Sequence, residues 1–146
     1  MKLLAICILA ALLPGCAARP VDRDPFAATD SNDARALRAY LHNGGDPNAR
    51  SANGESLLYI ATGPHGGEDV LRLLLERGAN PNVGAGSYSP LMNASSWCWL
   101  KGVSLLAEAG ADLKARNEKG QTALQTLCSA GRGRDEMVAY LRGRGL

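Results

Sequence analysis

The chain repeats itself with a period of 33 residues, and this repetition limits its possible folds more than any other feature. Three segments open on an oxygen-bearing side chain followed by apolar residues, and these side chains, Ser56, Ser89 and Thr122, are 33 residues apart. A second series of Leu-rich segments follows the first, at 70–80 and 102–112, and in altered form at 137–145. Such a period indicates an array of small units that bury their apolar faces only against one another.

Each unit is expected to contain two helices joined by turns. Ser56, Ser89 and Thr122 are suited to cap the first helix by accepting from its free N–H groups, and Pro90 fits the first helical position. Glycines follow the Leu-rich segments, where a helix commonly ends in a left-handed residue: Gly44, Gly78, Gly110 and Gly145. The segments between units are too short for another helix and suit projecting, hairpin-like turns: 49–53, 83–88 and 113–121.

In these features the chain resembles the ankyrin-repeat family, whose unit opens on Gly-x-Thr-Pro-Leu-His-x-Ala and closes on Leu-Leu-x-x-Gly-Ala-Asp. The resemblance covers residues 24–146, with Asp24-Pro25-Phe26 in place of the first Thr-Pro-Leu. It implies an all-α solenoid of about four repeats with short hairpin-like turns. The repeats would be 24–50 as the N-terminal cap, 51–83, 84–116, and 117–146 as the C-terminal cap.

The repeats depart from the family pattern in several places. The motif histidine, which in the family ties neighbouring repeats together, is replaced by Tyr59, Met92 and Gln125, so we expect a weakened polar network and moderate stability. The loops between the two helices carry insertions in repeats two and four, at 63–67 and 131–134. The turn before Ser89 is one residue shorter than its equivalents.

The N-terminus has the pattern of a secretory signal, because Lys2 is followed by eleven apolar residues, a run too short to span a bilayer. Leu13-Pro14-Gly15-Cys16 then resembles the lipobox of bacterial lipoproteins, although Pro14 departs from the usual pattern. The resemblance implies removal of residues 1–15, acylation of Cys16, and a tether over 16–23. Ala17 would direct the protein to the periplasmic face of the outer membrane. The alternatives are plain secretion, or a buried apolar helix with an incidental cysteine.

Charge and motif content exclude several classes of function. Sixteen Lys and Arg against 14 Asp and Glu leave a net charge of +2, too near balance for a nucleic-acid-binding surface. The two histidines, His42 and His65, lack metal-ligand spacing with other donors. No phosphate-binding loop and no set of nucleophile, base and orienting residue is recognisable. We therefore expect no enzyme, no metal or cofactor, and no small-molecule substrate.

Cysteine usage points to a possible disulfide. Cys7 would leave with the signal and Cys16 would be acylated, which leaves Cys98 and Cys128 in an oxidising compartment. These two would end the first helices of adjacent repeats, which the resemblance stacks about 10 Å apart. A bridge needs Cα atoms within about 7 Å, so a local shift is required. Two buried thiols are the alternative.

The resemblance also implies where a partner binds. Ankyrin proteins generally bind partners in a concave groove made by the turn tips and the first helices. The matching positions here are Asn53, Glu55, Tyr88, Trp97, Lys119 and Gln121, with Ala52 beside them. Trp97 and Trp99 replace the Gly-His that usually links the two helices. We expect Trp97 to point outward as an anchor and Trp99 to be partly packed, since exposed Trp is typical of interface hot spots. The alternative is that one of them fills space left by the altered motifs.

Together these features predict a non-catalytic, lipid-anchored periplasmic module that binds a protein partner. The most specific hypothesis is an immunity protein that occludes the active site of a secreted toxic effector, an analogy of fold and location rather than of residues. One alternative is a supporting partner of an endogenous envelope enzyme, for example in oxidative stress. Another is a structural envelope lipoprotein.

Overall fold

The computed structural model describes residues 24–129 and 132–145, so the lipobox and its Cys16 lie outside the described residues. The named helices of this part follow in chain order: α1 Pro25–Asp30, α2 Ala34–His42, α3 Leu57–Ala61, α4 Glu68–Glu76, α5 Pro90–Ser96, α6 Leu100–Glu108 and α7 Arg132–Gly143.

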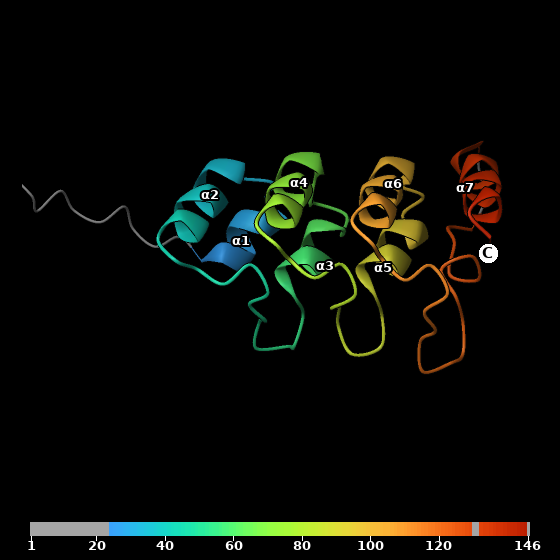
Figure 1. Ribbon diagram of the computed structural model, residues 1–146, viewed down its shortest axis with the longest axis horizontal. Helices are drawn as coiled ribbons and strands as arrows, with labels where there is room; N and C mark the ends of the chain where they lie inside the picture. Colours follow the sequence, from blue (N-terminus) through green and yellow to red (C-terminus); the bar gives the residue numbers. More distant parts are fainter. Residues whose placement is uncertain (1–23, 130–131, 146) are drawn as a thin grey trace, which may run out of the picture.

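The helices form two layers that run along the length of the molecule (Figure 1). The inner layer contains α1, α3 and α5, and the outer layer contains α2, α4, α6 and α7. Long turns project from the inner layer, and the extended pairing found in the described residues consists of isolated bridges, Arg50 with Ser56 and Ala85 with Tyr88. The predicted all-α solenoid with hairpin-like turns is confirmed.

The helix starts follow the predicted capping chemistry. The Ser56 hydroxyl accepts from the Tyr59 N–H at 3.0 Å, and Ser89 accepts from Met92 at 3.2 Å. Asp24 caps α1 by accepting from the Phe26 N–H at 3.0 Å. The helix ends are also as predicted, with left-handed glycines at Gly44, Gly78, Gly110 and Gly145.

The turn before α5, at 83–88, which is one residue shorter than its equivalents, is tight. Ala85 and Tyr88 exchange two backbone hydrogen bonds, at 3.1 and 3.0 Å, around Gly86 and Ser87. Gly86 adopts a φ of 57°, which glycine reaches without steric penalty. This short turn brings Tyr88 beside the inner layer.

Repeat four differs from the prediction in two ways. Residues 122–127 form only a turn, and Thr122 caps no helix; its N–H instead donates to the Gln125 side chain at 2.9 Å. A helix of five residues needs burial to persist, and α3 has it because Leu57, Leu58 and Ala61 are buried. In 122–127 only Ala123 is buried. The predicted inserted loop is also wrong at 132–134, which form the first turn of α7.

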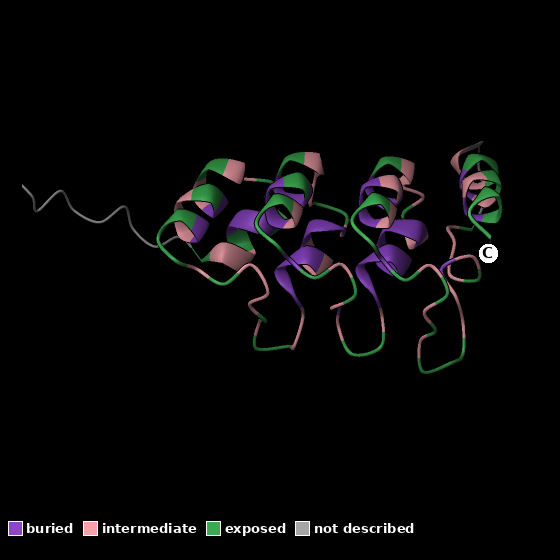
Figure 2. Cartoon of the chain, in the orientation of Figure 1, coloured by how far each residue is buried: buried purple, intermediate pink, exposed green. Residues whose placement is uncertain are grey.

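The core lies between the two layers, where the helices face one another (Figure 2). It is built mainly from leucines contributed by every repeat, and the outward sides of α2, α4 and α6 are exposed. The largest fully buried side chains include Leu37, Leu58, Leu74, Leu91, Met92, Leu106, Met137 and Leu141. Because each helix pair covers its neighbour, the stack holds together through contacts between adjacent repeats.

Asparagine side chains make polar contacts between neighbouring repeats. Replacement of the motif histidines had been expected to weaken such contacts. The Asn93 amide donates to the Tyr59 carbonyl at 3.0 Å and to the Thr62 hydroxyl at 3.2 Å. In the turns after the outer helices, Asn48 accepts from the N–H of Asn80 at 2.8 Å, and Asn82 accepts from that of Asp112 at 2.7 Å. The expectation of a weakened polar network overlooked these contacts.

Candidate functional site

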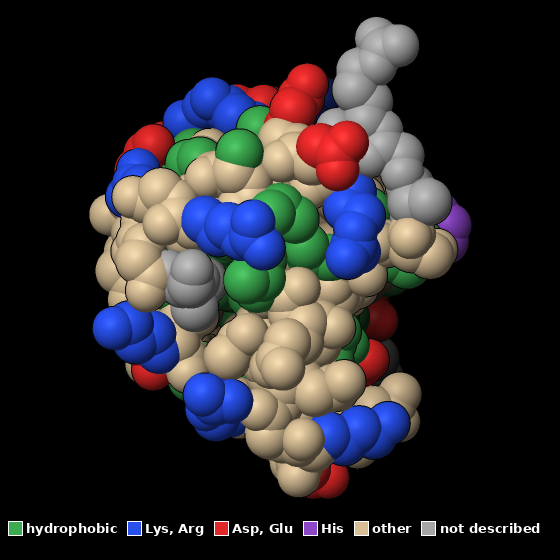
Figure 3. Space-filling model, turned by 90° about the vertical axis from the view of Figure 1, so that its right-hand side faces the viewer, with side chains coloured by type: hydrophobic (Ala, Val, Ile, Leu, Met, Phe, Trp, Pro, Cys, Tyr) green, Lys and Arg blue, Asp and Glu red, His purple; other side chains and the backbone are tan. Residues whose placement is uncertain are grey.

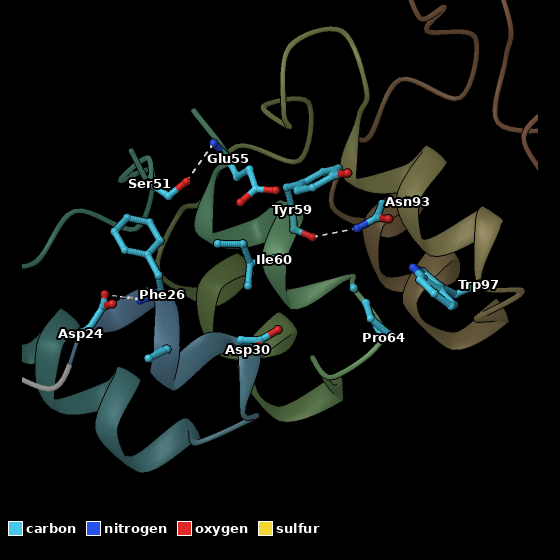
Figure 4. A pocket seen from close by; sticks show the side chains of 12 residues that line it. Asp24, Phe26, Asp30, Ser51, Glu55, Tyr59, Ile60, Pro64, Asn93 and Trp97 are labelled. Carbon is cyan, nitrogen blue, oxygen red and sulfur yellow. Dashed lines mark hydrogen bonds between the residues drawn. The ribbon is translucent and has the colours of Figure 1, made fainter. Parts of the chain in front are cut away.

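The inner layer carries a hollow of about 530 Å³ that spans three repeats, called the groove below (Figure 4). Its walls come from α1, the turn before α3, α3 itself, the following loop, and α5 with the residue after it. The lining residues are Asp24, Phe26, Ala27, Asp30, Ser51, Glu55, Tyr59, Ile60, Gly63, Pro64, Asn93 and Trp97.

Aromatic rings line the groove, one from each of three successive repeats. Phe26 comes from α1, Tyr59 from α3, and Trp97 from the end of α5. Trp97 is 54% exposed, and no other large hydrophobic side chain is exposed in the part of the chain that the structure describes. The Tyr59 ring also meets Tyr88 edge-to-face, with ring centres 6.5 Å apart. The groove therefore offers flat apolar surfaces that water covers when no partner is bound.

Three carboxylates line the groove, and none of the described residues that line it is Lys or Arg. Asp24 caps α1, while Asp30 lies 3.7 Å from the imidazole Nδ1 of His65, both side chains being mostly exposed. Within the described residues the Glu55 carboxylate has no hydrogen bond or ion pair. Burial first, and then the nearby Glu55 and Tyr88, raise the pKa of Tyr59 above its usual value. The groove is thus acidic and aromatic.

The two tryptophans take the positions expected from the sequence. Trp97 lines the groove and also a second hollow of about 470 Å³ behind it, where it meets Trp99. Trp99 is half-buried against the core, and its ring lies so close to Gly102 that a Cβ there would come within 2.3 Å of it. Trp97 therefore forms a projecting wall between two hollows, and Trp99 supports the loop that carries it.

Of the other residues predicted for the binding surface, all but Asn53 line one of two separate hollows. Glu55 shares the groove with Trp97, whereas Tyr88, Lys119 and Gln121 line a separate hollow of about 490 Å³ between the turns at 83–88 and 113–121. Asn53 is exposed at a turn tip and belongs to neither of these hollows. The structure thus splits the predicted surface into an N-terminal and a C-terminal part.

Sequence reasoning missed the α1 side of the groove. Aligning Asp24-Pro25-Phe26 with Ser56-Leu57-Leu58 puts Phe26 at the position of the fully buried Leu58. In the structure Phe26 is only half-buried and faces the groove, because α1 is the first described helix of the inner layer and no described helix packs on its other side. Tyr59 was noted as a lost histidine, although its ring is a groove wall.

Cys98 and Cys128 are joined by a disulfide, with Cα atoms 5.6 Å apart. Two local features supply the shift that the bridge needs. Cys98 lies beyond the end of α5 with a φ of 51°, and the chain before Cys128 is a turn rather than a helix. Cys128 also donates its N–H to the Ser95 carbonyl at 3.4 Å. The bond fastens repeat four to the loop that carries both tryptophans.

Two features are absent from the described residues. No group of three or more His, Cys, Asp or Glu side chains in this part of the chain could hold a metal ion. No helix among residues 24–129 and 132–145 is long and apolar enough to cross a membrane.

Comparison with known proteins decides the family. A model of ankyrin repeats, in three copies, matches residues 26–117. This chain is an ankyrin-repeat protein. A relative from Treponema pallidum (strain Nichols), described as ankyrin repeat-containing, is 39% identical over 72 residues. That alignment covers 45% of this ankyrin-repeat chain and 24% of the relative, so the chain spans about a quarter of the relative's length.

The family assigns a general role to the groove. Ankyrin repeats are protein–protein interaction modules and typically not enzymes. The groove of this ankyrin-repeat protein, with its rings and free carboxylate, therefore belongs to a module that binds proteins.

Proposed function

We propose that this protein is a non-catalytic binding protein, anchored by a lipid on Cys16 to the periplasmic face of the outer membrane, whose groove holds a protein partner. The observation that carries the binding proposal is Trp97. It is more than half exposed and stands as a wall between two hollows. A large exposed ring beside a concave surface is typical of an interface hot spot.

The most specific form of the proposal is an immunity protein that occludes the active site of a secreted toxic effector. Support comes from the combination of an N-terminal sequence that resembles a signal and lipobox with a groove on a stack of repeats. An inhibitor held at the membrane would meet an incoming effector before it reached its target. The fold and location carry this form of the proposal by analogy.

Trp97→Ala should weaken partner binding by at least about 2 kcal/mol, which is roughly a thirtyfold rise in Kd. The full-length protein, purified in mild detergent, serves as bait for envelope and secreted proteins, and captured proteins are identified by mass spectrometry. Affinity for each is then measured by calorimetry. Lys101→Ala is the matched control, because Lys101 is an exposed residue of the neighbouring α6 that lines none of the hollows described above.

The activity of the captured partner distinguishes the forms of the proposal. If the partner loses its activity on binding, this protein acts as an immunity protein. If the partner is an enzyme whose stability or activity rises on binding, this protein acts as a supporting partner of that enzyme. A partner without enzymatic activity supports a structural lipoprotein. Capture that is equal for wild type, Trp97→Ala and Lys101→Ala would show that the groove is not the binding surface.

The anchor is tested separately by Cys16→Ser. A single thioether-linked diacylglycerol and one further acyl chain bury many methylenes at about 0.8 kcal/mol each, so the wild type should stay with membranes through carbonate washing. Cys16→Ser should lose the lipid mass and, if exported, appear in the soluble fraction. Cys7→Ser is the control, since Cys7 lies in the segment that would be removed. Unchanged mass and fractionation for Cys16→Ser would contradict lipidation.

A further inference from the structure

The charges around the groove specify the kind of segment that can enter it. Among the described residues that line it, the three carboxylates on Asp24, Asp30 and Glu55 are accompanied by no Lys or Arg. The guanidinium of Arg50, five residues before Glu55, is engaged at the turn tips, where it donates to the carbonyls of Gly54 and Gly84. Among the described side chains, the imidazole of His65 lies 3.7 Å from the Asp30 carboxylate. A ligand that enters the groove therefore meets negative charge.

The rings lie among these carboxylates. Glu55 lies between the turn and the N-cap Ser56 of α3, beside Tyr59 (Figure 4). Asp30 ends α1 below Tyr59, and Phe26 and Trp97 lie at the two ends of the groove. Cations bind well over aromatic faces, and arginine combines stacking on a ring with hydrogen bonds to a carboxylate. The same residues would repel an acidic segment.

We infer that the groove takes an extended, basic segment of the partner, with arginine or lysine side chains over the rings and against the carboxylates. This inference rests on the proposed binding function and names the chemistry of the partner. Neighbouring helices of a stack lie about 8–10 Å apart, so rings from three repeats span roughly 20 Å. An extended chain rises about 3.3 Å per residue, which makes the segment about six residues long.

The charge distribution along the chain agrees with this assignment. Residues 24–96 contain eight Asp and Glu against five Lys and Arg, whereas residues 97–146 contain five against eight. The C-terminal end of the molecule accordingly shows more Lys and Arg than Asp and Glu on its surface (Figure 3). A basic segment is attracted to the N-terminal half and repelled by the C-terminal half, which sets where along the groove it binds.

The test uses the full-length protein in mild detergent and two labelled decapeptides, one alternating Arg and Ser and the other alternating Glu and Ser. Fluorescence anisotropy at about 50 mM salt should show saturable binding of the Arg peptide, with affinity falling as salt rises. The Glu peptide should not bind. Equal binding of both peptides, or of neither, would overturn the inference.

The contributing carboxylates are tested by the double variant Asp30→Asn with Glu55→Gln. Because each charge-assisted contact that is lost weakens binding severalfold, this variant should bind the Arg peptide at least about tenfold more weakly. The matched control is Glu76→Gln with Glu108→Gln, which removes the same charge from the exposed ends of α4 and α6. An equal loss in both double variants would show that net charge alone attracts the peptide. Circular dichroism of each variant checks that the stack remains folded.

The two proposals fail in different ways. If a protein partner is captured through Trp97 but the Arg peptide does not bind, the binding function stands and the basic segment is wrong. If the Arg peptide binds through Asp30 and Glu55 but no protein is captured, the groove chemistry stands and the proposed function is wrong. Concentration-dependent dimers in light scattering that the Asp30→Asn, Glu55→Gln variant abolishes would make the occupant a second copy of this chain, which would overturn the assignment to a partner.

Discussion

Reduction of the Cys98–Cys128 disulfide should lower the free energy of unfolding of the C-terminal repeat by about 3 to 4 kcal/mol. The bond closes a segment with a sequence separation of 30 residues, and the loop-closure entropy that it removes from the unfolded chain corresponds to this value in the chain-entropy model. Repeat four depends on the bond because residues 122–127 form only a turn, with Ala123 as their one buried residue. Met137 and Leu141 then hold α7 to the core.

The effect of reduction should be local, since each repeat of a solenoid contacts only its neighbours. Hydrogen exchange with and without reductant should show faster exchange in α7 and unchanged exchange in α3 and α4. The variant Cys98→Ser with Cys128→Ser should behave like the reduced protein and should not respond to reductant. Equal protection of α7 in the oxidised and reduced protein would contradict the prediction.

Leu106→Ala should destabilise the protein by about 3 kcal/mol, within the range of roughly 2–5 kcal/mol typical of buried leucines. Leu106 is fully buried in α6, and α6 packs against α4, α5 and α7. Truncation leaves a cavity between rigid helices that cannot close around it. The loss therefore affects contacts on both sides of the third repeat.

Urea unfolding followed by circular dichroism measures this change. Lys101→Ala, an exposed substitution on the same helix, should alter the free energy of unfolding by less than about 0.5 kcal/mol. A change below about 1 kcal/mol for Leu106→Ala would mean that neighbouring side chains refill the site. The core around Leu106 would then rearrange to fill the cavity, although Leu106 is fully buried.

Most of the fold could be predicted from sequence because local chemistry determines it. Ser56 and Ser89 cap helices through atoms three residues away, and the left-handed glycines, such as Gly78, end helices within one turn. Repetition then places the same two helices in each unit. Such short-range signals can be recognised in a single sequence.

The fourth repeat could not be predicted in the same way, because the conformation of residues 122–127 depends on how far their apolar side chains are buried by other parts of the chain. Thr122 carries the capping oxygen, and Leu124 is suited to a helix, yet the segment lacks the burial that holds α3. The contacts of Asn48, Asn82 and Asn93 were equally hidden, because each joins residues about 30 positions apart through side-chain geometry. Sequence position alone does not show which amide meets which carbonyl.

The candidate site was predicted in part. Glu55 and Trp97 were assigned to the binding surface, and the structure places both on the groove. Phe26 and Asp30 were missed because the first repeat matches the family motif poorly, so nothing fixed which way its helix faced. Lys119 and Gln121 were predicted to share one surface with Glu55 and Trp97, but the structure puts them on a separate hollow with Tyr88. Residues on one face of a stack need not share one cavity.

The recurring asparagine contact has a consequence for how such a chain can evolve. Asn48 and Asn82 each bind the backbone of the next repeat in the same way, so duplication or deletion of an interior repeat would recreate the contact without other changes. At the equivalent place before repeat four stands Lys114, whose side chain has no acceptor. Gain or loss of whole repeats is therefore easiest between positions 48 and 112. In related chains, changes in repeat number should be found there.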